Sequence, residues 1–102
     1  MCFRDRFGYR LITMRRYYGL SGRRTFNISK NSKIDRTLVF ELVSESGTIG
    51  ITLINKVTNE ETNRTNMKTG VYGFKIKMGE PYQLIITSSK AVGSYKLRIG
   101  NV

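Results

Sequence analysis

Basic and aromatic residues gather in two parts of this sequence, and these residue types can bind polyanions. One run near the N-terminus places two cations beside two aromatic rings: Arg15, Arg16, Tyr17 and Tyr18. Guanidinium groups neutralise phosphates and aromatic rings stack on bases, so the combination is typical of nucleic-acid binding. Four further basic residues lie in the C-terminal third, at alternating positions of two expected strands: Lys75, Lys77, Lys96 and Arg98.

Alternate residues of a strand share one face of a sheet. If the two expected strands belong to one sheet, the four C-terminal cations form a positive stripe. The alternative is a solvated face, whose lysines prevent association between sheet edges. Both interpretations stay open, because charge alone does not separate phosphate, anionic glycan and acidic lipid surfaces. These eight residues are the candidate polyanion-binding set.

Residues suited to catalysis are scarce. The sequence has no histidine and a single cysteine, Cys2, whereas nucleophilic catalysis needs a base and zinc sites need nitrogen and sulfur ligands. A Ser88-Ser89-Lys90 run matches a Ser/Lys dyad only in composition, because it lies in an expected turn. The carboxylates are separated by turns, and Glu41 alone is expected in the middle of a strand. We therefore expect a protein that is not an enzyme, without catalytic or metal-binding residues and without a cofactor.

The elements that position these residues are strands. Apolar and polar residues alternate with a period of two in the stretches 37–43, 48–54, 71–78, 82–87 and 94–99. Short turns that contain glycine separate them, and no segment has a helical period. We also expect short strands at 7–12 and 25–28, and a hairpin in the polar stretch 55–68. The pattern predicts an all-β fold, a small antiparallel β-sandwich of jelly-roll or Ig-like type with about seven or eight strands.

The same alternation predicts which side chains form the core. The expected core residues are Phe26, Leu38, Phe40, Leu42, Ile49, Ile51, Leu53, Tyr72, Phe74, Ile76, Leu84, Ile86, Tyr95, Leu97 and Ile99. In the strand at 37–43 the opposite face is only partly polar, since Val39 and Val43 flank Glu41.

Composition divides the chain near Gly22. The formal net charge is +11, and every basic residue up to Arg24 is an arginine, whereas lysines dominate afterwards. We expect an Arg-rich segment at 1–22 and a β-sandwich domain at 23–102. Three interpretations of the Arg-rich segment stay open: the first strand with a linker of the same domain, an anion-binding arm, or upstream sequence before an internal start at Met14.

The C-terminal third resembles a bacterial pattern of strand and turn motifs. Its motifs are Gly70-Val71-Tyr72, a turn at Gly79, Tyr82-Gln83-Leu84 and Gly93-Ser94-Tyr95. Over about residues 20–100 the chain is similar to small β-sandwich modules of secreted or lipid-anchored bacterial proteins, the pre-peptidase C-terminal-like domains. The resemblance implies a module that binds, spaces or assists a partner without catalysing a reaction.

We therefore expect a non-catalytic interaction or accessory module, at a bacterial cell surface or secreted, whose partner is a protein or a cell-surface polymer. The alternative is a small basic protein that binds nucleic acid or another polyanion. No apolar run reaches the length of a membrane-spanning helix, and no intact signal peptide is visible, so the location stays open. Exposed edge strands offer a route to oligomers.

Overall fold

The computed structural model describes residues 10–28 and 35–100, and this part of the chain is all-β. Its five strands are β1 (Arg10–Ile28), β2 (Arg36–Asn55), β3 (Glu61–Arg64), β4 (Gly70–Ile76) and β5 (Tyr82–Gly100). They form one antiparallel sheet in the order β1-β5-β2-β3, and β4 pairs with another part of β2. The predicted all-β, antiparallel fold is confirmed at this level.

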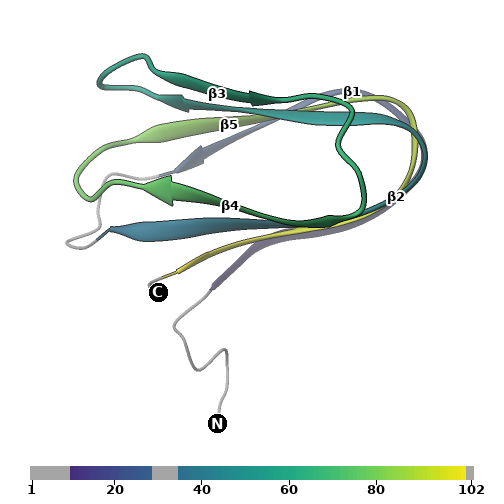
Figure 1. Ribbon diagram of the computed structural model, residues 1–102, viewed down its shortest axis with the longest axis horizontal. Helices are drawn as coiled ribbons and strands as arrows, with labels where there is room; N and C mark the ends of the chain where they lie inside the picture. Colours follow the sequence, from purple (N-terminus) through teal and green to yellow (C-terminus); the bar gives the residue numbers. More distant parts are fainter. Residues whose placement is uncertain (1–9, 29–34, 101–102) are drawn as a thin grey trace, which may run out of the picture.

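Three of the strands are about 20 residues long and bend together. The pairing of β1 with β5 shifts register between Tyr18 and Gly22, and the pairing of β2 with β5 shifts between Ser44 and Thr48. Bulges of this kind strengthen the local bend of a strand. The sheet therefore turns back on itself, and its two halves face each other (Figure 1).

The two halves are named here after their short strands. The β4 half contains residues 10–18, 36–44, 70–76 and 92–100. The β3 half contains residues 22–28, 48–55, 61–64 and 82–89.

Several expected turns are bends within continuous strands. The segments 44–47 and 88–93 were expected to separate strands, yet they lie inside β2 and β5. Gly47 and Gly93 have φ angles of +75° and +147°, which glycine adopts without the penalty of a Cβ. Because the register shifts lie side by side, the strands bend without losing their partners. β1 likewise runs through Gly22, with the segment 25–28 as its last part.

The other expected strands agree with the structure in part. The hairpin expected in 55–68 is present, with β3 at 61–64 paired to residues 51–54 of β2. The strand expected at 7–12 lies partly outside the described residues, and its described end belongs to β1. β4 ends at Ile76, two residues before the expected end at Met78.

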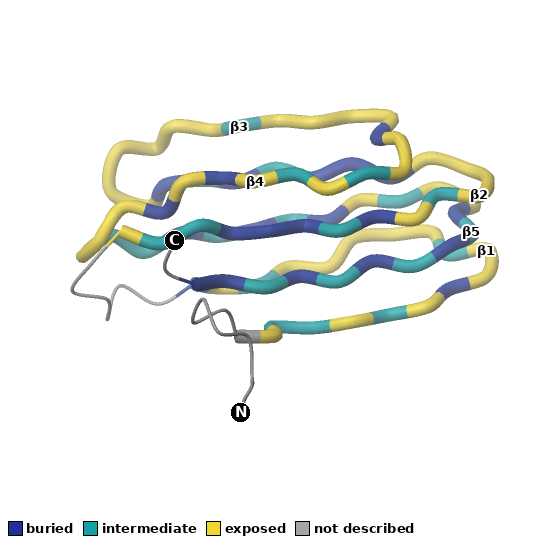
Figure 2. Tube along the Cα trace, turned by 60° about the horizontal axis from the view of Figure 1, so that its bottom comes forward, coloured by how far each residue is buried: buried dark blue, intermediate teal, exposed yellow. Residues whose placement is uncertain are grey.

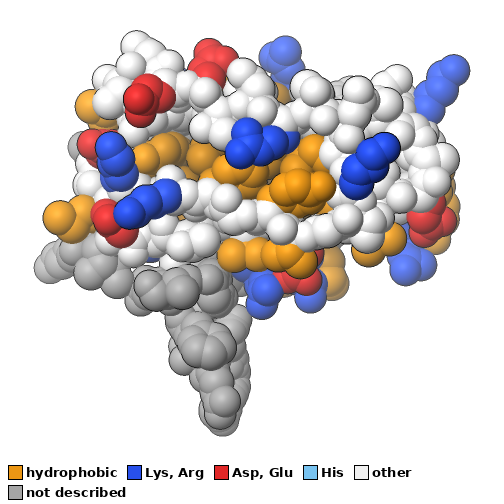
Figure 3. Space-filling model, viewed as in Figure 1, with side chains coloured by type: hydrophobic (Ala, Val, Ile, Leu, Met, Phe, Trp, Pro, Cys, Tyr) orange, Lys and Arg blue, Asp and Glu red, His pale blue; other side chains and the backbone are white. Residues whose placement is uncertain are grey.

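The hydrophobic core lies between the two halves. Figure 2 shows buried and less buried residues alternating along the strands, and Figure 3 shows hydrophobic side chains in the opening between the halves. Thirteen of the expected core residues are buried, and Phe26 and Tyr72 are partly buried against them. Six buried apolar residues were absent from the expected list: Tyr17, Ile28, Val39, Met67, Tyr82 and Ala91.

A buried asparagine ties together the ends of β2 and β5. The Asn55 side chain donates to Glu80 Oε1 at 2.7 Å and to Tyr82 Oη at 3.2 Å. Its Oδ1 accepts hydrogen bonds from the backbone N–H groups of Val57 and Thr58. Its backbone N–H donates to the carbonyl of Glu60, and its carbonyl accepts from the N–H of Asn59. Every polar group of this Asn55 cluster has a protein partner, as a buried amide requires.

Candidate functional site

The Arg-Arg-Tyr-Tyr run of the candidate set lies on β1, and the strand divides it between two faces. Arg15 and Tyr17 pair opposite Tyr95 and Gly93, on the face that turns toward the core. Arg16 and Tyr18 have the opposite orientation, and Tyr18 is 76% exposed. The four side chains therefore do not form one cluster, because neighbouring residues of a strand point in opposite directions.

Tyr17 is a core residue. Its side chain is 4% exposed, and its ring centroid lies 5.7 Å from that of Tyr95, which in turn packs against Phe40. Burial raises the pKa of the Tyr17 hydroxyl, and Tyr95 adds a smaller effect in the same direction. Tyr17 is not accessible to stack on a ligand.

The C-terminal cations occupy two strands of the β4 half that are not neighbours. Lys96 and Arg98 lie on β5 and Lys75 lies on β4, with β2 between them, while Lys77 follows the end of β4. Glu41 of β2 pairs opposite Lys96 and forms an ion pair with Arg98 at 2.5 Å. The stripe expected from alternation is therefore interrupted by a carboxylate.

The face of the β4 half that points away from the core is called the outer face. It combines cations from β1 and β5 with exposed aliphatic residues from three strands. Met14, Val43 and Val71 are 64%, 47% and 71% exposed. Lys96 lies in a row across the sheet that runs from Met14 to Lys96, Glu41 and Val71, and Arg16 lies in the row of Ser94 and Val43.

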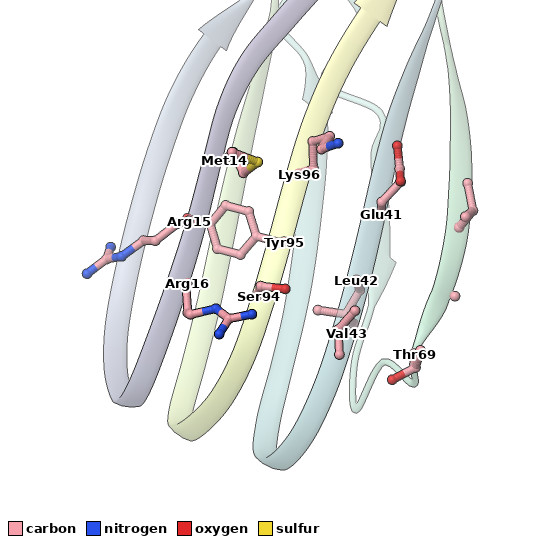
Figure 4. A pocket seen from close by; sticks show the side chains of 12 residues that line it. Met14, Arg15, Arg16, Glu41, Leu42, Val43, Thr69, Ser94, Tyr95 and Lys96 are labelled. Carbon is pink, nitrogen blue, oxygen red and sulfur yellow. The ribbon is translucent and has the colours of Figure 1, made fainter.

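A hollow of about 580 Å³, the outer hollow, opens on this face. Figure 4 shows its lining, with Arg16, Ser94, Val43 and Lys96 on neighbouring strands, while Arg15 extends away from them. Its size falls within the range of about 300–1,000 Å³ that is usual for ligand sites. A second hollow of about 620 Å³ lies between residues 44–48 and 66–69, and its lining is mainly small polar residues.

Sequence reasoning identified Arg16 and Lys96 and missed the aliphatic residues between them. The partly polar strand face at Val39 and Val43 was the available signal. It did not predict that β1, β5, β2 and β4 lie side by side, which brings Met14 and Val71 to the same surface. The arrangement can bind a ligand that has both negative charge and apolar groups.

Neither a protein-family model nor a curated protein matches this chain. In the part of the chain that the structure describes, no helix is long and apolar enough to cross a membrane. The described residues also bring together no group of three or more acids and cysteines that would hold a metal ion.

Proposed function

We propose that this chain is a non-catalytic interaction module that binds an acidic, partly apolar protein segment through the outer face. The outer hollow supports this proposal, because Arg16 and Lys96 lie beside Met14, Val43 and Val71. Exposed apolar surface with charged residues around it is typical of interaction sites. The cations match carboxylates of the partner, and the aliphatic side chains match its apolar residues.

The mixture of residue types favours a protein segment over a nucleic acid. A single-stranded nucleic acid needs several aromatic platforms on a basic groove. Tyr18 is exposed near this face, while Tyr17 is buried in the core. Glu41 also lines the outer hollow and pairs with Arg98, so this face lacks the continuous basic groove that a nucleic-acid backbone needs.

Charge reversal within and outside the face tests the proposal. We expect Lys96→Glu to weaken binding of a labelled peptide with alternating Glu and Leu residues about tenfold or more, because like charges would then meet. Lys56→Glu changes the formal net charge equally, from +11 to +9, but lies in the turn after β2. Fluorescence anisotropy measures both. Equal losses in the two variants would contradict a defined site on the outer face.

Nucleic-acid binding is the second candidate function. Arg16 and the exposed Tyr18 point to the same side of β1, and the formal net charge is +11. This function predicts affinity for a labelled oligonucleotide that falls steeply with salt, and a loss of affinity in Tyr18→Ala. Point substitutions suit this experiment better than deletion of the Arg-rich segment, because that deletion would remove most of β1.

We further propose that the fold is a small β-sandwich of seven or eight strands, of jelly-roll or Ig-like type, from a secreted or cell-surface bacterial protein. Each of the three long strands contributes a segment to both halves, and β3 and β4 add one each, which supports this classification. The motif resemblance supports the location. Fractionation of the source cells tests it, and a protein confined to the cytoplasm would contradict it.

A further inference from the structure

A second cationic feature lies at the β1 edge, where the two halves of the sheet meet, and its lining shares only Arg15 and Tyr95 with the outer hollow. A hollow of about 60 Å³, here called the edge hollow, opens between the β1 bend and β5. Three arginines are among its lining residues: Arg15 before the bend, and Arg23 and Arg24 after it. The Arg24 guanidinium lies over the Phe26 ring, 5.0 Å from the ring centroid. The bend brings the three arginines together, because it places both parts of β1 at the same side of the molecule.

Hydroxyl groups complete the lining of the edge hollow. Ser21 accepts a hydrogen bond from the backbone N–H of Lys90 at 2.9 Å, and Ser88 donates to the carbonyl of Gly22 at 3.4 Å. These bonds join β1 to β5 at the bend. The lining contains no aspartate or glutamate among the described residues, so its charge is positive throughout.

One residue of the lining has a buried hydroxyl without a partner. Tyr95 lines the hollow and is 2% exposed, and its hydroxyl has no hydrogen-bond partner among the described residues. A buried hydroxyl without a partner costs on the order of 1–3 kcal/mol. Such groups call for an explanation, and a bound anion is one that fits a hollow lined by three arginines.

We propose that the edge hollow binds one oxyanion group, of the phosphate or sulfate type, through Arg15 and Arg24, which share one face of β1, with the Tyr95 hydroxyl as a further donor. Guanidinium groups bind such oxygens with charge-assisted hydrogen bonds, and their planar fork suits two oxygens at once. The small volume excludes a nucleotide inside the hollow, because sites for whole ligands measure about 300 Å³ or more. A phosphate group attached to a larger molecule can still enter with its remaining atoms in solvent.

The test uses the full chain, with sodium phosphate, sulfate or chloride added at equal ionic strength. We expect phosphate and sulfate to raise the melting temperature along a saturable curve. Both salts stabilise many proteins through exclusion from the surface, an effect that does not saturate. A linear rise, or a rise equal to that in chloride, overturns the proposal.

Substitutions of lining residues test whether phosphate binds in the edge hollow. The double variant Arg15→Gln/Arg24→Gln is expected to lose about ten- to a hundredfold in phosphate affinity, as the loss of charged hydrogen bonds implies. Lys56→Gln, outside the hollow, is the matched control. Tyr95→Phe keeps the ring and removes only the hydroxyl, and we expect it to fold and to bind phosphate more weakly. Unchanged affinity in the double variant overturns the proposal.

Two further measurements complete the experiment. Amide chemical shifts of the wild-type chain should change with phosphate at residues 15, 22–24, 88 and 95, and changes confined to other residues overturn the assignment. O-phospho-L-serine is compared with inorganic phosphate to separate two sources of the group. Tighter binding of phosphoserine indicates a modified protein as the source, and equal binding indicates the free ion. Lys96→Glu on the outer face should change the affinities for inorganic phosphate and for phosphoserine by less than about threefold. A negative result for one proposed site would therefore leave the proposal for the other site unaffected.

Discussion

The Asn55 cluster and the edge hollow both place polar groups in the interior of this small sheet, and they differ in how those groups are satisfied. Asn55 is 3% exposed and bonds Glu80, Tyr82 and two backbone N–H groups. Tyr95 is 2% exposed, and its hydroxyl has no partner among the described residues. The first region closes the end of the sheet with its own groups.

Buried polar groups that stabilise the fold therefore differ from buried polar groups that a ligand can bind. A buried network in which each group has a partner rigidifies the fold and leaves no free donor or acceptor for a ligand. The Tyr95 hydroxyl, in a residue that lines a hollow with three arginines, still has one proton to donate. The Asn55 cluster therefore accounts for stability, and the edge hollow is the region where a ligand would change stability.

Gly93→Ala should have the largest effect, because it disturbs the bend next to Tyr95. A Cβ at position 93 would overlap the carbonyl oxygen of Val43 on β2, and the φ of +147° is strained for alanine. We expect a loss of roughly 3 kcal/mol or more in unfolding free energy. Gly73→Ala is the control, since its Cβ would meet only Thr37 Cγ2 at 3.7 Å. Urea denaturation with equal stability for both variants would contradict this role of Gly93.

Asn55→Ala is expected to cost about 2–3 kcal/mol, since it leaves several buried partners without hydrogen bonds. Asn63 provides the matched substitution, because it is exposed and its side chain bonds Thr52 at 2.6 Å. Asn63→Ala should stay within about 0.5 kcal/mol of the wild type. The comparison of the two regions breaks down if thermal or urea unfolding shows similar costs for both alanines.

Two tyrosine hydroxyls sharpen the comparison directly. Tyr82 Oη accepts from Asn55 Nδ2 and from the Lys77 backbone N–H, both at 3.2 Å. Tyr82→Phe should therefore cost about 1 kcal/mol, and Tyr95→Phe should cost close to zero in chloride buffer. In saturating phosphate the Tyr95→Phe variant should become less stable than the wild type. A cost for Tyr95→Phe in chloride equal to that of Tyr82→Phe would show that its hydroxyl is already satisfied.

The smallest predicted effect concerns alkaline pH. Burial raises the pKa of Tyr17 above its ordinary value of 10.0. The folded protein therefore holds this proton more tightly than the unfolded chain, so the contribution to stability is complete below pH 10 and is lost as pH rises further. Urea midpoints measured from pH 8 to 11 should fall less steeply in Tyr17→Phe. Parallel slopes for Tyr17→Phe and the wild type would contradict the assignment.

The alternation of side chains was sufficient to predict the strands and most of the core. Phe40, Leu97 and Ile99 are buried as expected, because a period of two places them on one face of β2 or β5. The same rule could not predict Met67, which lies in a polar stretch after β3 and is buried where its N–H bonds Ile49. Contacts of this kind depend on the path of a loop.

The candidate residues show the same division. Alternation alone implies that Arg15 and Tyr17 face away from Arg16 and Tyr18, but only the pairing with β5 decides which pair faces the core. The arginines at 23 and 24 join Arg15 through the bend of β1. Their meeting depends on a register shift, and no local pattern of residues predicts its size.

The sequence by itself determined the all-β class, the positive charge and the residues that alternate toward a core, because these depend on local spacing and composition. The tertiary structure decided that expected turns are bends in three long strands, that β2 separates β4 from β5, and that cations meet aliphatic residues on the outer face. Strand order and bends arise from hydrogen bonds and packing between segments far apart in the chain. They are therefore properties of the whole sheet.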